Sequence, residues 1–136
     1  MQALLALVSA TLAFKTASRR NRDPDTLKPA DCPAVFLLED SETYERYSPS
    51  MPPKRVLLVS AVFYNDIGTD QSQSPATAIN TALDALDLAF RPMTPSGLFT
   101  MNGLVDSVVI EGEVKKAPGD RTGRSVAIVP IRVVLP

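Results

Sequence analysis

The sequence predicts an α+β fold in which a mainly antiparallel sheet of about four to five strands carries two helices on one face. Three observations favour this fold. Apolar runs rich in β-branched residues alternate with proline-containing polar loops, two stretches have helical spacing of apolar residues, and no short βαβ unit repeats. We therefore expect hairpin pairing in each half of the chain.

The first helix is expected at about residues 2–17, in a stretch that begins MQALLALVSATLAF. Its apolar stripe comprises Leu4, Leu5, Val8 and Leu12. The stretch has the apolar character of a signal peptide, but no lysine or arginine precedes it, and it is too short to span a bilayer. We expect a helix of the mature protein, in a chain that is cytosolic where it is made.

Four strands and a second helix complete the expected order. Strands are expected at about residues 33–39 and 54–65, a helix at about 75–91, and a final antiparallel pair of strands at about 103–115 and 125–135. The strongest strand, KRVLLVSAVFYND, is apolar on both faces. Helices should cover one of these faces, and something else should cover the other.

The last strand, SVAIVPIRVVLP, contains a proline at its centre. Pro130 has no N–H for a ladder hydrogen bond, and prolines within sheets occur on edge strands or at bulges. We expect this strand to lie at or near an edge of the sheet, bent at Pro130, with its end at a subunit boundary.

Composition argues against catalysis. The 136 residues, expected to form a single domain (1–136), include no histidine and one cysteine, Cys32, which we expect to be buried and inert. A Ser–His–Asp triad is impossible, and neither a phosphate-binding loop nor a metal motif is present. Glu111 and Glu113 are expected to be solvated on one strand face. We predict no catalytic residue, no cofactor and no metal, and we do not expect an enzyme.

The charge pattern gives little reason to expect attraction to nucleic acid or to a membrane. The net charge is -1, so no overall field favours either partner. Arg19, Arg20 and Arg22 form a basic cluster that is expected to end a helix in solvent, with phosphate contact as the alternative.

Two polar loops that project from the sheet contain most of the candidate interface residues. The loop SETYERYSPSMPP carries two tyrosines of the kind that anchor partners, and Thr43–Tyr47 within it is expected to pair briefly as a hairpin arm. The loop IGTDQSQS is a second candidate. The predicted interface residues are Tyr44, Glu45, Arg46, Tyr47, Asp66, Asp70, Gln71, Pro130 and Arg132.

The order of these segments resembles the tail terminator proteins of long-tailed (siphovirus-type) bacteriophages. The resemblance covers most of the chain and is carried by AINTALDALDLAF, NGLVDSVVIEGEV and SVAIVPIRVVLP. Asn102-Gly103 stands where that family usually has two glycines, which is a mild departure. The positions that match the family pattern are Asn80, Leu83, Asp84, Gly103, Val129, Pro130 and Ile131.

This resemblance implies a structural role at the tail–head junction of a virion assembled in the host cytoplasm. Such proteins form a ring, typically hexameric, that caps the head-proximal end of the tail tube and stops its polymerisation. The implied partners are further copies of the chain, the tail tube protein and a neck or head-completion protein, and DNA passes through the channel. Two alternatives stay open: a head-completion or head–tail joining protein, and a non-phage cytosolic module that binds a partner.

Overall fold

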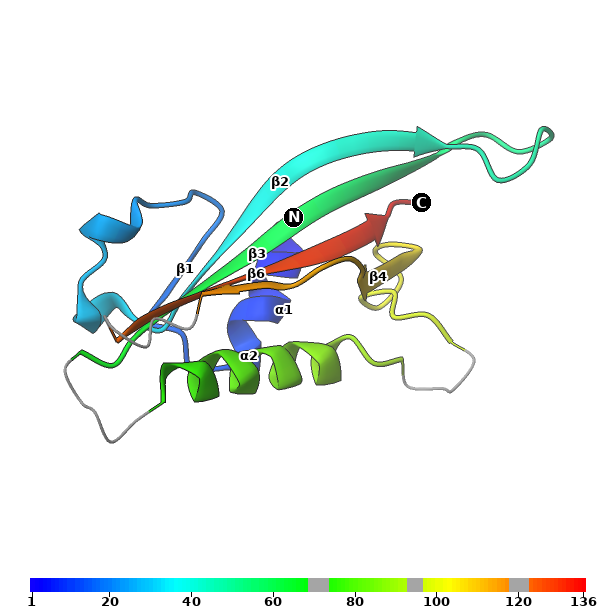
Figure 1. Ribbon diagram of the computed structural model, residues 1–136. Helices are drawn as coiled ribbons and strands as arrows, with labels where there is room; N and C mark the ends of the chain where they lie inside the picture. Colours follow the sequence, from blue (N-terminus) through cyan, green and yellow to red (C-terminus); the bar gives the residue numbers. More distant parts are fainter. Residues whose placement is uncertain (69–73, 93–96, 118–122) are drawn as a thin grey trace.

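The computed structural model describes residues 1–68, 74–92, 97–117 and 123–136, and it confirms the α+β fold (Figure 1). One mixed sheet, mostly antiparallel, has the strand order β1-β2-β3-β6-β4, with β5 also paired to β6. Its only parallel pair within the described ranges joins β1 to β2. The elements are α1 (Gln2–Thr11), β1 (Thr16–Ser18), two 3₁₀ turns (Pro24–Thr26 and Pro29–Asp31), β2 (Ala34–Glu45), β3 (Lys54–Asp66), α2 (Pro75–Ala89), β4 (Ser107–Ile110), β5 (Lys115–Ala117) and β6 (Arg124–Val134).

Both helices pack on the same face of the sheet, as expected. Leu4 and Val8 of α1 and Ile79 and Leu86 of α2 join the main apolar cluster. Alternate residues of the central strands complete it, because side chains two apart along a strand share a face. These strand residues are Val35, Leu37, Leu57, Val59, Ala61, Phe63, Ala127, Val129, Ile131 and Val133.

The opposite face of the sheet is only half covered. At one end, Leu27 and Cys32 pack on Phe36, Val62 and Tyr64 to form a second, smaller cluster. The segment that carries Leu27 and Cys32 lies between β1 and β2. Beyond it, Leu58, Val109 and Ile128 on this face stay partly exposed, and we call these residues the open face.

The first helix is shorter than expected. It ends at Thr11 rather than near residue 17, because the chain turns to add a strand to the edge of the sheet. The Lys15 N–H donates to the Pro33 carbonyl at 2.9 Å, and Thr16–Ser18 then pairs in parallel with β2. The arginine cluster that was expected at a helix end therefore follows a strand, and Arg19 forms an ion pair with Glu39.

The strand expected at 103–115 is also wrong in its bounds. It is replaced by two short strands, β4 and β5, with a break between them. Gly112, at φ +124°, lies in this break, in a backbone region that favours glycine. Together β1 and β5 raise the strand number to six, above the expected four to five.

The proposed edge position of the last strand is contradicted. The strand β6 pairs along its whole length with β3, and on its other side with β4 and β5. Pro130 is tolerated there because it faces the β4–β5 break, where a ladder is already interrupted. Its carbonyl still accepts a hydrogen bond from the Glu111 N–H at 3.2 Å.

Candidate interaction surface

Within the described residues, no group of three or more histidine, cysteine, aspartate or glutamate side chains could hold a metal ion. In the same part of the chain, no helix is long and apolar enough to cross a membrane. Four features of the described residues are candidates for interaction: an arm, a charged cluster beside it, the open face and an apolar recess.

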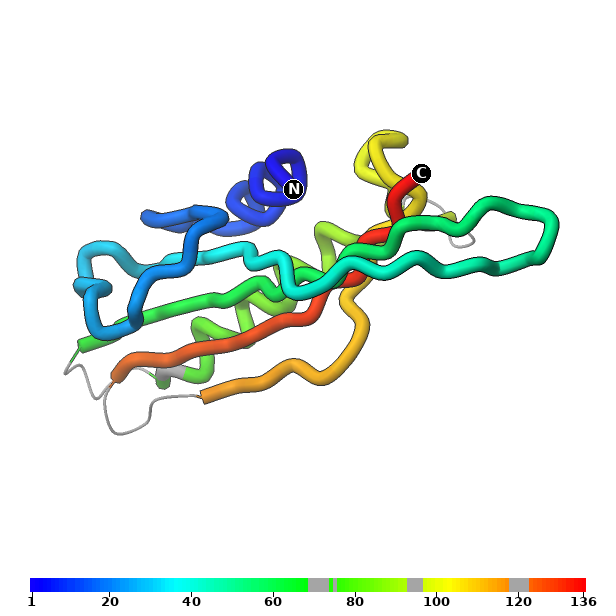
Figure 2. Tube along the Cα trace, turned by 90° about the horizontal axis from the view of Figure 1, so that it is seen from above, coloured from blue at the N-terminus to red at the C-terminus, as the bar shows by residue number. Residues whose placement is uncertain are grey.

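The arm is the far part of the β2–β3 hairpin, residues 41–57, and it extends past the helices (Figures 1 and 2). A bulge lies at Asp40, between the Glu39 and Ser41 pairings. Beyond it the two strands stay paired to Glu45 opposite Lys54, so the predicted hairpin arm at Thr43–Tyr47 forms over its first three residues. A bulge increases the local twist of a strand, which suits an arm that leaves the body of the sheet.

Side chains of the arm are mostly in solvent. Tyr44 and Tyr47 are both exposed, whereas Phe63 and Tyr64, further along the hairpin, are buried. Arg55 donates to Glu42 at 2.7 Å, and this hydrogen bond lowers the pKa of the Glu42 carboxyl. Arg46 follows the last residue of β2 and is exposed. The arm therefore offers aromatic surface on a paired, charged frame.

Three of the predicted interface residues meet in one cluster. Arg132 of β6 donates to Glu45 at 2.6 Å and to the Tyr47 hydroxyl at 3.1 Å. Tyr47 in turn donates to Glu45 at 2.9 Å, and Glu111 lies 4.0 Å from the Arg132 guanidinium. The hydrogen bond to Tyr47, with the charges of Glu45 and Glu111, raises the pKa of Arg132. This cluster ties the end of β2, within the arm, to β6.

The open face lies next to this cluster and is apolar. Leu58, Val109 and Ile128 are 39%, 42% and 36% exposed, although each belongs to a paired strand. Leu58 and Val109 flank Arg132 across the sheet. Pro130 lies on the same face, two residues from Arg132 along β6. Apolar side chains that stay partly in solvent on paired strands make this face a candidate interaction surface.

Asp66, a predicted interface residue, forms an ion pair within the chain. Its carboxylate accepts from Arg124 at 3.1 Å, and its side chain is only 8% exposed, so it holds β3 to β6 within the chain. Asp70 and Gln71, also predicted as interface residues, lie outside the described residues.

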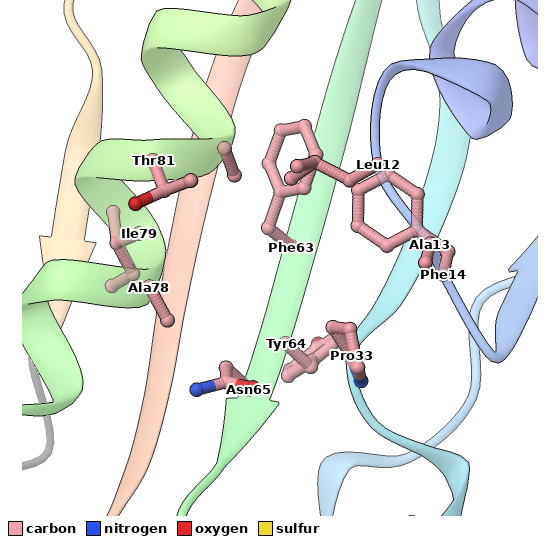
Figure 3. Close-up of a pocket in the computed structure, with 11 residues that line it drawn as sticks. Leu12, Ala13, Phe14, Pro33, Phe63, Tyr64, Asn65, Ala78, Ile79 and Thr81 are labelled. Carbon is pink, nitrogen blue, oxygen red and sulfur yellow. The ribbon is translucent and has the colours of Figure 1, made fainter. Parts of the chain in front are cut away.

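An apolar recess of about 280 Å³ opens between the end of α1, β3 and α2. Figure 3 shows Leu12, Phe14, Phe63 and Ile79 around it. The rings of Phe14 and Phe63 are 5.7 Å apart. Among the described residues that line the recess, Tyr64 is the only titratable one, and burial raises the pKa of its phenol.

The apolar residues of the open face were not predicted as site residues. The signal was present in KRVLLVSAVFYND, whose second face is apolar, but the sequence alone did not tell which part of that face stays uncovered.

No protein-family model matches the chain, and no curated protein matches it significantly.

Proposed function

We propose that this chain is a phage tail terminator: a structural protein that assembles into a ring on the head-proximal end of the tail tube and stops its growth. The observation that carries the proposal is the open face beside the projecting arm. The resemblance of the sequence to tail terminators supports the choice of partners.

The open face favours assembly with further copies of the chain. Leu58, Val109 and Ile128 lie in paired strands and stay in solvent, so covering them releases water from apolar surface. Contacts between two different patches of identical chains generate a ring when the rotation closes. The arm and the open face are different patches of one chain, which suits such a head-to-tail contact.

The arm has the form of a docking element. It extends beyond the body of the sheet, so it reaches a neighbour or the tail tube without moving the core (Figure 2). The hydrogen bonds of Arg132 to Glu45 and Tyr47 hold the arm at the end of β2, which lowers the entropy cost of binding through the exposed Tyr44. A role of this kind works by shape and needs no reactive group.

The ring proposal is also compatible with passage of DNA. The chain has 14 basic and 15 acidic residues, and several of the charges described here are neutralised within the chain. A channel built from such subunits would have little electrostatic affinity for phosphates.

Labelling of particles by electron microscopy tests the proposal. A gold-conjugated antibody against the chain would be applied to intact virions, to headless tails and to tailless filled heads. A tail terminator labels one end of headless tails and leaves tailless heads unlabelled. Label on tailless heads would instead assign the chain to the neck, and absence of label from all particles would favour the non-phage binding module.

A further inference from the structure

Residues 19–33, which we call the strap, cover the end of the sheet face opposite the helices. Figure 1 shows this blue segment looping beside the start of β2. Leu27 and Cys32 of the strap are almost fully buried, on Phe36 and Tyr64 of the sheet. The six buried residues of this cluster are separate from the main core between sheet and helices.

One side chain of the sheet fastens the strap through its main chain. Arg124 of β6 donates through Nη2 to the Leu27 carbonyl at 2.7 Å and, through Nη1, to the Pro24 carbonyl. The same guanidinium binds Asp66 of β3, at 3.1 Å from Nη2 and 3.3 Å from Nε. The planar guanidinium can hold several acceptors in fixed directions at once. We call Arg124 and Asp66 the clasp.

The internal structure of the strap is local. Its two 3₁₀ turns are closed by hydrogen bonds between near neighbours, such as Thr26 N–H to the Asp23 carbonyl and Asp31 N–H to the Lys28 carbonyl, both 2.9 Å. Asp23 also accepts from the Asp25 N–H at 3.0 Å. These bonds do not require the sheet, so the strap can leave it without first losing its turns.

Further contacts between the strap and the sheet lie near the two ends of the strap. The Arg19–Glu39 ion pair is about half exposed on both sides, and such pairs contribute little. Asn21 hydrogen-bonds the Tyr64 hydroxyl. The Pro33 carbonyl accepts from Lys15 beside β1. The middle of the strap thus depends on Leu27, Cys32 and the clasp.

We propose that the strap opens as a unit while the sheet and helices stay folded, and that the clasp sets how often it opens. Segments with few buried contacts open at lower free energy than the core to which they are attached. Opening uncovers Phe36, Val62 and Tyr64, which adjoin the open face. The apolar surface available to a partner then extends to the end of the sheet. Opening of the strap does not depend on the proposed function.

Cys32 reports on this opening directly. It is the only cysteine of the chain and is 5% exposed. Burial, with the nearby charge of Asp66, raises the pKa of its thiol, so reaction with a thiol reagent in the closed state is slow. The rate of Cys32 labelling by a maleimide under native conditions therefore measures the open fraction.

The first test uses the unchanged protein. Cys32 labelling and amide exchange at Ile131 of β6 would be followed at increasing urea below the unfolding transition. We expect the Cys32 thiol to be protected against labelling at least about 10-fold less than the Ile131 amide is protected against exchange. The labelling rate should depend only weakly on urea, because little surface is exposed when the strap opens. Equal protection and equal urea dependence at both sites would overturn the proposal.

Variants of the clasp give the second test. Arg124→Met removes charge-assisted hydrogen bonds to the strap, so we expect labelling of Cys32 to be about 10- to 100-fold faster. Arg55→Met, which breaks a distant ion pair on the arm, is the matched control and should leave the rate within about twofold. Where Arg124→Met fails to fold, Arg124→Lys keeps the charge without the fork. A labelling rate in Arg124→Lys no faster than in the unchanged protein would refute the role of the clasp.

Discussion

Replacing Gly112 by alanine tests the explanation of the proline in β6. Gly112 lies in the break between β4 and β5 at φ +124°, opposite Pro130. A Cβ atom added there would lie 3.1 Å from Cγ and 3.4 Å from Cβ of the proline ring. The 3.1 Å distance is tighter than ordinary van der Waals contact, and a pyrrolidine ring on a strand paired on both sides has little room to move.

Two costs add in this variant. A residue with a side chain held in a sparsely populated backbone region costs about 1–3 kcal/mol. Crowding of the proline ring adds about 1–3 kcal/mol, as for other overpacked sites. We therefore expect Gly112→Ala to lower the free energy of unfolding by about 2–6 kcal/mol, a large part of the 5–15 kcal/mol typical of a domain.

Urea denaturation followed by circular dichroism measures this change. The matched control is Gly103→Ala: Gly103 is at φ +84°, but no atom lies within 4 Å of an added Cβ. The control should cost only about 1–2 kcal/mol, from the backbone alone. The double variant Gly112→Ala/Pro130→Ala should recover part of the loss. If Gly112→Ala were no more destabilising than Gly103→Ala, close packing of proline on the break would be refuted.

Three further predictions concern the core, pH and the charged cluster. Leu86→Ala should lower the free energy of unfolding by about 2–5 kcal/mol, because Leu86 is fully buried. Leu88 is 66% exposed on the same helix, so Leu88→Ala should change the free energy of unfolding by less than about 0.5 kcal/mol. Thermal unfolding of both variants checks this prediction. Burial raises the pKa of the Cys32 thiol and of the Tyr64 phenol, so the folded state holds these two protons more tightly than the unfolded state does. The stability that this provides is fully present below the ordinary pKa values of about 8.5 and 10, and it is lost as the pH rises through the raised pKa values. A urea midpoint at pH 10.5 that is not below the midpoint at pH 7 would contradict this prediction. Arg132→Leu should lower the free energy of unfolding by only about 1 kcal/mol, because Glu45 stays partly in solvent, yet should weaken any assembly that uses the arm, as gel filtration would show.

Strong local patterns predicted the centre of the fold. The β3 strand was expected at about 54–65 and spans Lys54–Asp66, and α2 was expected at about 75–91 and spans Pro75–Ala89. In both, the hydrophobic pattern and the flanking turn residues agree with the packing. These two elements could therefore be predicted without knowing which segments pair or pack with them.

Elements whose form depends on a distant partner were not predicted. The first helix ends early because Thr16–Ser18 pairs with β2, and the strand at 103–115 is divided because Gly112 meets Pro130 across the ladder. Neither contact has a local signature. Intrinsic propensity is a weak guide where tertiary pairing competes with it.

The same reasoning explains which site residues were found. Tyr44 and Tyr47 were predicted because aromatic residues in a polar loop are candidates for contacts, and both are exposed. The hydrogen bonds of Arg132 to Tyr47 and Glu45 join residues 85 and 87 apart in sequence, and only the strand register reveals them. Asp66 was predicted as an interface residue from its place in a polar loop, whereas its ion pair with Arg124 was hidden until β3 and β6 were paired.

The length of the tail tube tests the proposed function most directly. Tails would be imaged by electron microscopy in lysates of phage that lack this chain and in lysates complemented with it. We predict tubes that overgrow their normal length in its absence and a single uniform length once it is restored. Tubes of normal length that fail to join heads in its absence would contradict a terminator and place the chain in the neck.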